Sequence, residues 1–134
     1  MIFFDTNVLV YGIVMQDADK QRRACALIER ALTDRQLAVS PLVISELIYV
    51  LTRLGADGEL LRRNIKFFKQ FAFHDISRDM VWEAFDVAQR HNNAKHINDI
   101  IHIKYAERYC ARIVTFDRGY ETFRDYTALT VEIV

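Results

Sequence analysis

Short apolar runs alternate along the chain with longer segments in which apolar residues recur every three or four positions. The short runs predict strands at 2–4, 37–39, 73–76, 112–116 and 130–134. The longer segments predict helices at 18–32, 41–54, 59–71, 79–90 and 97–110. Because strands separated by helices need crossover connections, we expect an α/β fold. It should be a three-layer α/β/α sandwich whose mostly parallel central sheet has about five strands.

Two elements carry the clearest local signals. The helix at 41–54 is preceded by Ser40, a favoured N-cap, and begins with Pro41, which suits the first helical position. The first strand, 2–4, is wholly apolar, as is typical of a strand covered on both faces, yet it ends abruptly in Asp5. A carboxylate at the end of a covered strand is partly desolvated and needs something to hold it.

Composition narrows the class of protein. A chain of 134 residues is expected to form one domain, and 51% hydrophobic with 27% charged residues is typical of a globular protein. Cys25 and Cys110 stand alone, without metal-binding or disulfide spacing, which favours a reducing, cytoplasmic setting. No apolar run approaches the length of a membrane span and no basic leader precedes the first one, so we expect neither membrane insertion nor export.

Net charge gives no sign of a nucleic-acid partner, because 18 basic residues balance 18 acidic ones. A polyanion therefore has to be bound locally, by basic side chains or through cations. One side of the predicted helix 59–71 is the most basic stretch, and single basic residues lie close in sequence to two of the acids discussed below. These candidates are Arg62, Arg63, Lys66, Lys69, Lys95 and Arg118. The helix face is equally suited to solvent, to a dimer contact or to a partner protein.

Four acids from distant parts of the chain are predicted to meet at one edge of the sheet. Asp5 and Asp117 each follow a strand, and the carboxyl ends of parallel strands lie at the same edge. Glu46 lies less than two turns into the helix after the second strand, and Asp99 lies in the first turn of the last predicted helix. Helices of such a sheet begin at that edge, so the sequence predicts a crevice lined by four carboxylates.

Taken singly, two of these acids also have ordinary structural explanations. Asp117 precedes a glycine by two positions and suits a turn, and Asp99 suits the start of a helix. Glu46 is harder to explain in this way, because it sits at the margin of an apolar helix face with no basic residue one turn further along. Asp5, at the end of a covered strand, is the least compatible with a purely structural role.

Charge arithmetic indicates what holds the four acids together. Two carboxylates about 5 Å apart repel by about 3 kcal/mol at an effective dielectric near 20, so a divalent cation is expected between them. Oxygen ligands select a hard ion, Mg²⁺ or Mn²⁺, rather than zinc. The histidines show no metal-binding spacing, and we interpret all four as surface or boundary residues: His74, His91, His96 and His102. The implied chemistry is metal-assisted attack on a phosphodiester.

The order and spacing of four motifs resemble those of the PIN-domain ribonucleases, and most closely the VapC toxins of prokaryotic toxin–antitoxin pairs. The motifs are Asp5-Thr6-Asn7, Glu46 within SPLVISEL, Asp99 within INDIIHIKYAER and Asp117 within TFDRGY. The resemblance covers essentially the whole chain and implies a single PIN-like nuclease domain over 1–134. One departure is Ile100, which stands where the family commonly has a small residue.

The resemblance also implies roles for particular residues. Asp5, Glu46, Asp99 and Asp117 would be the catalytic residues and would hold one or two Mg²⁺ or Mn²⁺ ions, while Asn7 and Thr115 would orient carboxylates or water from nearby. The implied activity is endonucleolytic cleavage of RNA by a cytoplasmic homodimer that a small antitoxin protein restrains. The site as interpreted recognises the phosphodiester and not the 2′-hydroxyl, so DNA stays open as a second substrate.

Two alternatives from other functional classes stay open. A noncatalytic RNA- or protein-binding module of the same fold would carry the same pattern. A Mg²⁺-dependent phosphatase or a phosphoacceptor domain also places acids at strand ends, but the first needs an acid where Asn7 stands and the second needs paired acids beside Asp5. The sequence also leaves open whether Tyr11, Tyr49 and Phe67 are exposed or belong to the core.

Overall fold

The sheet at the centre of the fold has four strands in the order β2–β1–β3–β4. In the computed structural model, which describes residues 1–134, the strands are β1 Ile2–Phe4, β2 Leu37–Ala38, β3 Arg112–Thr115 and β4 Thr130–Ile133. All three pairings are parallel, and Phe3 in β1 lies opposite Ala38 on one side and Ile113 on the other. The mostly parallel sheet that the alternation of elements predicts is therefore confirmed.

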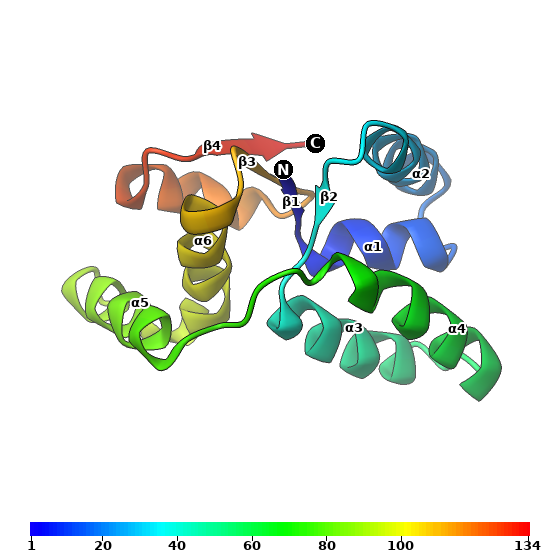
Figure 1. Ribbon diagram of the computed structural model, residues 1–134, viewed down its shortest axis with the longest axis horizontal. Coiled ribbons are helices and arrows are strands. Elements are labelled where there is room, and N and C mark those ends of the chain that lie inside the picture. Colours follow the sequence, from blue (N-terminus) through cyan, green and yellow to red (C-terminus); the bar gives the residue numbers. More distant parts are fainter.

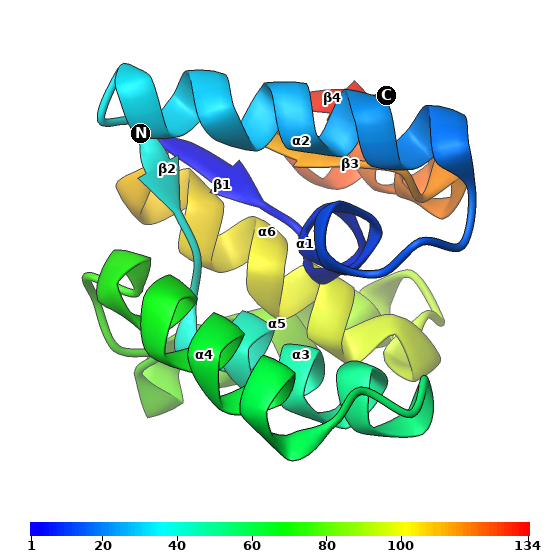
Figure 2. The same cartoon turned by 90° about the vertical axis from the view of Figure 1, so that its right-hand side faces the viewer.

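Helices cover both faces of this sheet, as the three-layer prediction requires (Figure 1). The helices are α1 Thr6–Ile13, α2 Ala18–Thr33, α3 Pro41–Arg53, α4 Gly58–Phe68, α5 Arg78–Arg90 and α6 Ile97–Tyr109. Figure 2 shows α2 lying along one face with α1 beside it, while α6 runs behind the sheet. The hairpin of α3 and α4 extends from the edge of the sheet where β1 leads into α1 (Figure 1).

The predicted strand at 73–76 is wrong, and the sheet has four strands rather than five. The segment after α4 makes one backbone hydrogen bond with the strand region, in which Val39 N donates to Phe71 O at 3.1 Å. Strand β2 has only two residues and lies at the edge of the sheet, so it offers no ladder along which another strand can pair. The segment is instead attached to α6, where Tyr105 Oη donates to His74 O at 3.3 Å.

Three further elements have no counterpart in the sequence prediction. One is the short 3₁₀ helix η2, Ala94–His96, and the other two are α1 and the 3₁₀ segment η3, Arg118–Tyr126. In α1 the consecutive residues Val8, Leu9 and Val10 are all buried, so the helix has no polar face there from which a period of 3.6 can be recognised. Helix α1 and segment η3 each begin directly after an acid of the predicted site, and in both cases that acid is the N-cap.

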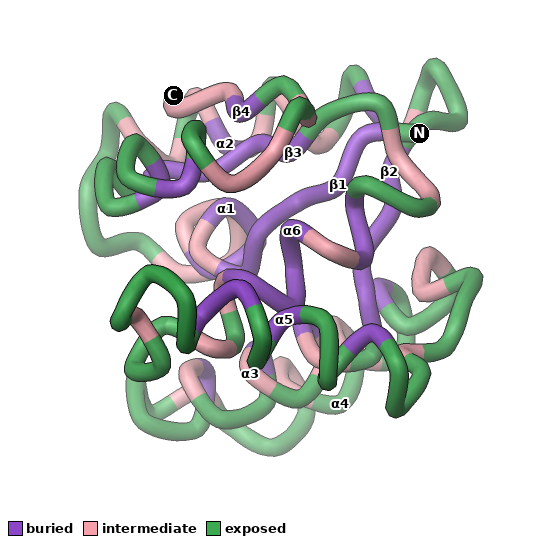
Figure 3. The backbone as a smooth tube through the Cα atoms, turned by 90° about the vertical axis from the view of Figure 1, so that its left-hand side faces the viewer, coloured by how far each residue is buried: buried purple, intermediate pink, exposed green.

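Buried residues run through β1 and β3, into the first half of α1 and through the middle of α6 (Figure 3). Ile100, the departure from the family pattern, is buried within this core, so the larger side chain packs there without being exposed. None of the helices combines the length and the apolar character that crossing a membrane requires. The core thus includes the elements that carry three of the four predicted acids: Asp5 follows β1, Asp117 follows β3 and Asp99 lies in the first turn of α6.

Candidate active site

The structure brings the four sequence-predicted acids to the carboxyl edge of the sheet. Asp5 follows β1, Asp117 follows β3, Glu46 lies in the second turn of α3 and Asp99 lies in the first turn of α6. All four line one cleft of about 520 Å³, together with Asn7. Acids that are up to about a hundred positions apart in the sequence therefore line the same cleft.

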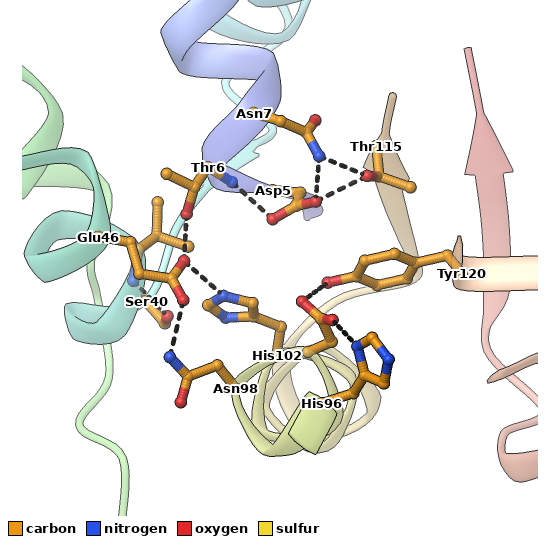
Figure 4. A network of polar contacts seen from close by, with 12 residues as sticks. Asp5, Thr6, Asn7, Ser40, Glu46, His96, Asn98, His102, Thr115 and Tyr120 are labelled. Atoms are coloured by element: carbon orange, nitrogen blue, oxygen red, sulfur yellow. Dashed lines mark hydrogen bonds and ion pairs between the residues drawn. The ribbon is translucent and has the colours of Figure 1, made fainter. Parts of the chain in front are cut away.

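Asp5 is held by hydrogen bonds on both carboxylate oxygens, and only 5% of the residue is exposed. Its Oδ1 accepts from the backbone N–H of Thr6 at 2.7 Å, which caps α1. Its Oδ2 accepts from Asn7 Nδ2 and from Thr115 Oγ1, both at 2.6 Å (Figure 4). The carboxylate is thus fixed in one orientation by β1, α1 and β3 together.

Burial raises the pKa of the Asp5 carboxyl from 3.8 to about 6. The nearby His102 and the hydrogen bond from Thr115 lower the pKa, whereas the negative charges of Asp99 and Glu46 raise it further. The ionised form of Asp5 is therefore disfavoured, mainly because the carboxyl is buried and to a smaller extent because other acids are near it.

Asn7 and Thr115 connect the ends of the two central strands. Asn7 Nδ2 also donates to Thr115 Oγ1 at 2.9 Å, and Asn7 Oδ1 accepts from the backbone N–H of Phe116 at 2.9 Å. Thr115 is fully buried, and its Oγ1 accepts from the backbone N–H of Asp117 at 3.0 Å. These contacts fix the chain on both sides of the site, so both residues position Asp5 and the start of the loop that carries Asp117.

Glu46 has an equally complete set of partners. Its Oε2 accepts from the Thr6 hydroxyl and from His102 Nε2, the latter at 2.9 Å, and its Oε1 accepts from Asn98 Nδ2 at 3.1 Å (Figure 4). Burial alone would raise the pKa of the Glu46 carboxyl, but the hydrogen bond and charge of His102, with the hydrogen bonds from Thr6 and Asn98, outweigh it and lower that pKa. Glu46 is therefore ionised at neutral pH.

The interpretation of His102 as a surface or boundary residue is wrong, because its side chain is completely buried. Its Nε2 donates to Glu46, since a carboxylate only accepts, while its Nδ1 is buried without a hydrogen-bond partner. Burial alone would lower the pKa of the imidazole, but the hydrogen bond to Glu46 and the charges of Asp5 and Asp99 raise it. His102 is thus the basic partner that the neighbours of Glu46 in sequence do not supply.

Two features of the sequence indicate that this histidine is buried near Asp99, although they do not identify Glu46 as its partner. His102 follows Asp99 by three positions, which places both side chains on the same face of α6. It is also surrounded in sequence by Ile100, Ile101 and Ile103, and a run of consecutive apolar residues indicates a buried part of a helix. A histidine in such a helix needs a buried polar partner, and an acid is the natural one.

The remaining two acids are more open to the cleft. Asp99 has only long contacts, with Tyr120 Oη at 3.4 Å from its Oδ1 and His96 Nδ1 at 3.4 Å from its Oδ2. Burial raises its pKa, opposed by the charge of His102 and reinforced by Asp117. Asp117 is exposed, and its Oδ1 accepts from the backbone N–H of Gly119 at 2.7 Å. Both side chains therefore retain oxygen lone pairs that point to no strong protein donor.

The four carboxylates have the donors and the uncompensated charge that a divalent cation needs. No lysine or arginine forms an ion pair with any of them. Carboxylate oxygens of Asp5 and Glu46 lie within 4.8 Å of each other, which is close enough for a shared ion. Because most of the available donors are carboxylate oxygens, the site fits a hard cation such as Mg²⁺ or Mn²⁺.

Fold and site together define a parallel α/β domain with a carboxylate cleft at the carboxyl ends of its strands. The model of the PIN domain family matches residues 2–127, and the chain belongs to that family. Among solved structures, the fold is similar to a chain in the crystal structure of VapBC2 from Rickettsia felis bound to a DNA fragment from their promoter. The TM-score is 0.70 at 19% sequence identity, over 100% of this chain and 99% of that chain. No curated protein matches.

Proposed function

We propose that this protein is a Mg²⁺- or Mn²⁺-dependent endoribonuclease that hydrolyses RNA phosphodiester bonds. PIN domains are generally nucleases, which supports the reaction class. The observation that carries the proposal is the cleft itself, in which four acids from four separate elements lie together without a lysine or arginine partner. A divalent cation would offset the negative charge that these acids place together, and cations bound by carboxylates commonly bind phosphate as well.

In this proposal Asp5, Glu46, Asp99 and Asp117 hold one or two ions. When bound, these ions lower the pKa of an attacking water and offset the negative charge that develops on the phosphodiester. Asp5 is oriented by Asn7 and Thr115, and Glu46 is oriented by His102, so neither carboxylate has to reorganise during the reaction. Asp99 and Asp117 present the oxygens that protein donors use least.

We further propose that the protein is the toxin of a toxin–antitoxin pair. The structural neighbour belongs to a VapBC complex bound to promoter DNA, which supports an antitoxin protein as partner for this chain as well. A cytoplasmic homodimer that the antitoxin restrains is part of the same proposal. Expression of the chain alone should arrest growth, and coexpression of a small DNA-binding protein encoded beside it should relieve the arrest. If cells that express an active nuclease grow normally, the toxin assignment is wrong.

The nuclease proposal is tested with end-labelled single-stranded oligoribonucleotides and purified protein. We expect shortened products with Mg²⁺ or Mn²⁺, none with EDTA, and recovery when either ion is restored. Asp99→Asn should reduce the rate more than about a hundredfold, since even partners of metal ligands are worth 10–100-fold. Asp125→Asn, an exposed aspartate in η3, is the matched control and should leave the rate unchanged.

Three results would contradict the proposal in different ways. Recovery of activity with Zn²⁺ alone would mean that oxygen ligands do not define the metal. Binding of RNA without shortening under every metal condition would favour the noncatalytic module of the same fold. Release of phosphate from small phosphate esters, with no oligonucleotide shortened, would favour a phosphatase.

A further inference from the structure

The four acids line only one part of the cleft. Beyond the carboxylates it continues along α1 and α3, where five of its lining residues are hydrophobic: Val10, Tyr11, Tyr49, Val50 and Leu54. Each helix places a polar site residue and a tyrosine one turn apart, Asn7 and Tyr11 in α1, Glu46 and Tyr49 in α3. The acidic part of the cleft therefore adjoins a part suited to a flat apolar group.

Tyr49 is the more available of the two tyrosines, because 61% of the residue is exposed although it lines the cleft. Arg53 lies one turn further along α3, donates to Tyr49 Oη at 3.3 Å and places its guanidinium 5.8 Å from the ring centre. The aromatic side chain is thus paired with a cation at the rim of an acidic cleft. Aromatic rings beside arginine are the groups on which unpaired nucleobases stack.

Tyr11 repeats this arrangement with a residue of α2. Lys20 Nζ donates to Tyr11 Oη at 3.2 Å and lies 4.8 Å from the ring centre. Neither Lys20 nor Arg53 forms an ion pair with a carboxylate, so both positive charges are free for another anion. Neither residue lines the cleft itself, but each contacts a tyrosine that does. The basic residues that the sequence singled out do not line the cleft either: Arg62, Arg63, Lys66, Lys69, Lys95 and Arg118.

We propose that Tyr49 is a stacking platform for an unpaired base of the RNA, with Arg53 and Lys20 binding flanking phosphates. The inference rests on the proposed nuclease function and specifies which residues of this chain bind a base and the phosphates beside it. A phosphodiester at the carboxylates places the attached nucleoside beside the apolar part of the cleft, one helical turn away. A base in a duplex stays paired and stacked on its neighbours, so it cannot reach Tyr49 without being extruded.

The test uses a single-stranded oligoribonucleotide that carries 2-aminopurine, whose fluorescence is quenched by stacking, mixed with protein and Mg²⁺ in a stopped-flow instrument. We expect quenching before cleavage with the wild-type protein and with Tyr49→Phe, which keeps the ring, and none with Tyr49→Ala. In steady-state cleavage, Tyr49→Ala should raise KM about 5- to 150-fold, the equivalent of one stacked base, and leave kcat within about twofold. Lys20→Gln should lower the salt dependence of binding by about 0.7 in the log–log slope.

Trp82→Ala is the matched control, because Trp82 is an aromatic residue of α5 that is 68% exposed and does not line the cleft. It should leave KM and the quench unchanged. Since the quench does not depend on cleavage, it decides the inference even if the wild-type protein cuts no RNA, a result that refutes the nuclease function alone. An active enzyme with unchanged KM in Tyr49→Ala, or equal cleavage of duplex and single strand, overturns the inference and leaves the nuclease function standing. A Tyr49→Ala protein that loses affinity only for a partner protein overturns it too.

Discussion

Replacing Asp5 with asparagine separates the catalytic role that we propose for this carboxylate from its effect on stability. In the folded protein the pKa of Asp5 is raised from 3.8 to about 6, mainly because the side chain is buried. A shift of about two pKa units corresponds to about 3 kcal/mol by which ionisation of Asp5 destabilises the fold. Asp5→Asn removes this charge, so it should abolish cleavage and yet leave a folded protein.

The net change in stability at pH 7 is smaller than 3 kcal/mol because the amide also disturbs hydrogen bonds. Oδ2 of Asp5 accepts from Asn7 and Thr115, and an amide nitrogen in its place faces two donors. A buried donor without a partner costs about 1–3 kcal/mol. We therefore expect Asp5→Asn to be between as stable as the wild-type protein and about 2 kcal/mol more stable at pH 7.

The pH dependence isolates the charge from this rearrangement. Because the folded-state pKa lies above the unfolded value, the penalty is absent below about pH 4, grows as the pH rises towards 6 and is fully present above it. The difference in unfolding free energy between Asp5→Asn and wild type should therefore shift in favour of the variant by about 3 kcal/mol from pH 4 to pH 7. The amide hydrogen-bond cost does not change over this range.

Urea unfolding monitored by circular dichroism, at pH 4, 5, 6 and 7 with EDTA present, measures the difference. The exposed Asp125→Asn is the control and should differ from wild type by a constant amount. A difference between Asp5→Asn and wild type that is constant with pH would show that Asp5 ionises as easily as an exposed aspartate. The argument that burial and the neighbouring acids disfavour the ionised form of Asp5 would then be refuted.

Three other expectations follow from the same contacts. His102→Ala should destabilise the protein by about 3 kcal/mol in urea unfolding, because it leaves the half-buried Glu46 carboxylate without its cation, whereas exposed His91→Ala should have little effect. Thr115→Val keeps the shape of the side chain but removes the hydroxyl that donates to Asp5. It should therefore lower the midpoint of thermal unfolding, and it should lower kcat in RNA cleavage assays. An unchanged kcat would exclude a positioning role for Thr115. Mg²⁺ at a hundred times its Kd should raise the unfolding free energy of the wild-type protein by about 3 kcal/mol, and an effect as large in Asp5→Asn would place the ion elsewhere.

The parts of the fold that could be predicted are those whose signals are local. Strand β1 and helix α3 are marked by a continuous apolar run and by Ser40 and Pro41, and the structure places both as expected. The meeting of Asp5 and Asp117 follows from the geometry of parallel strands, which needs no knowledge of side-chain packing. The strand expected at 73–76 failed because pairing depends on a partner, and the two-residue β2 offers no ladder.

The contacts that complete the site form between different elements. They depend on how those elements pack, so the spacing of residues in the sequence does not predict them. His102 supplies the positive charge that Glu46 lacks within its own helix, and the Thr6 hydroxyl reaches the same oxygen from α1. Glu46 is thereby held ionised, while Asp5 and Asp99 have their pKa values raised by burial and by neighbouring acids. One acid is thus stabilised by the protein and two are left to be stabilised from outside. This division favours a cleft whose negative charge is offset by a bound cation rather than by the fold, because a purely structural cluster would have paired every acid internally.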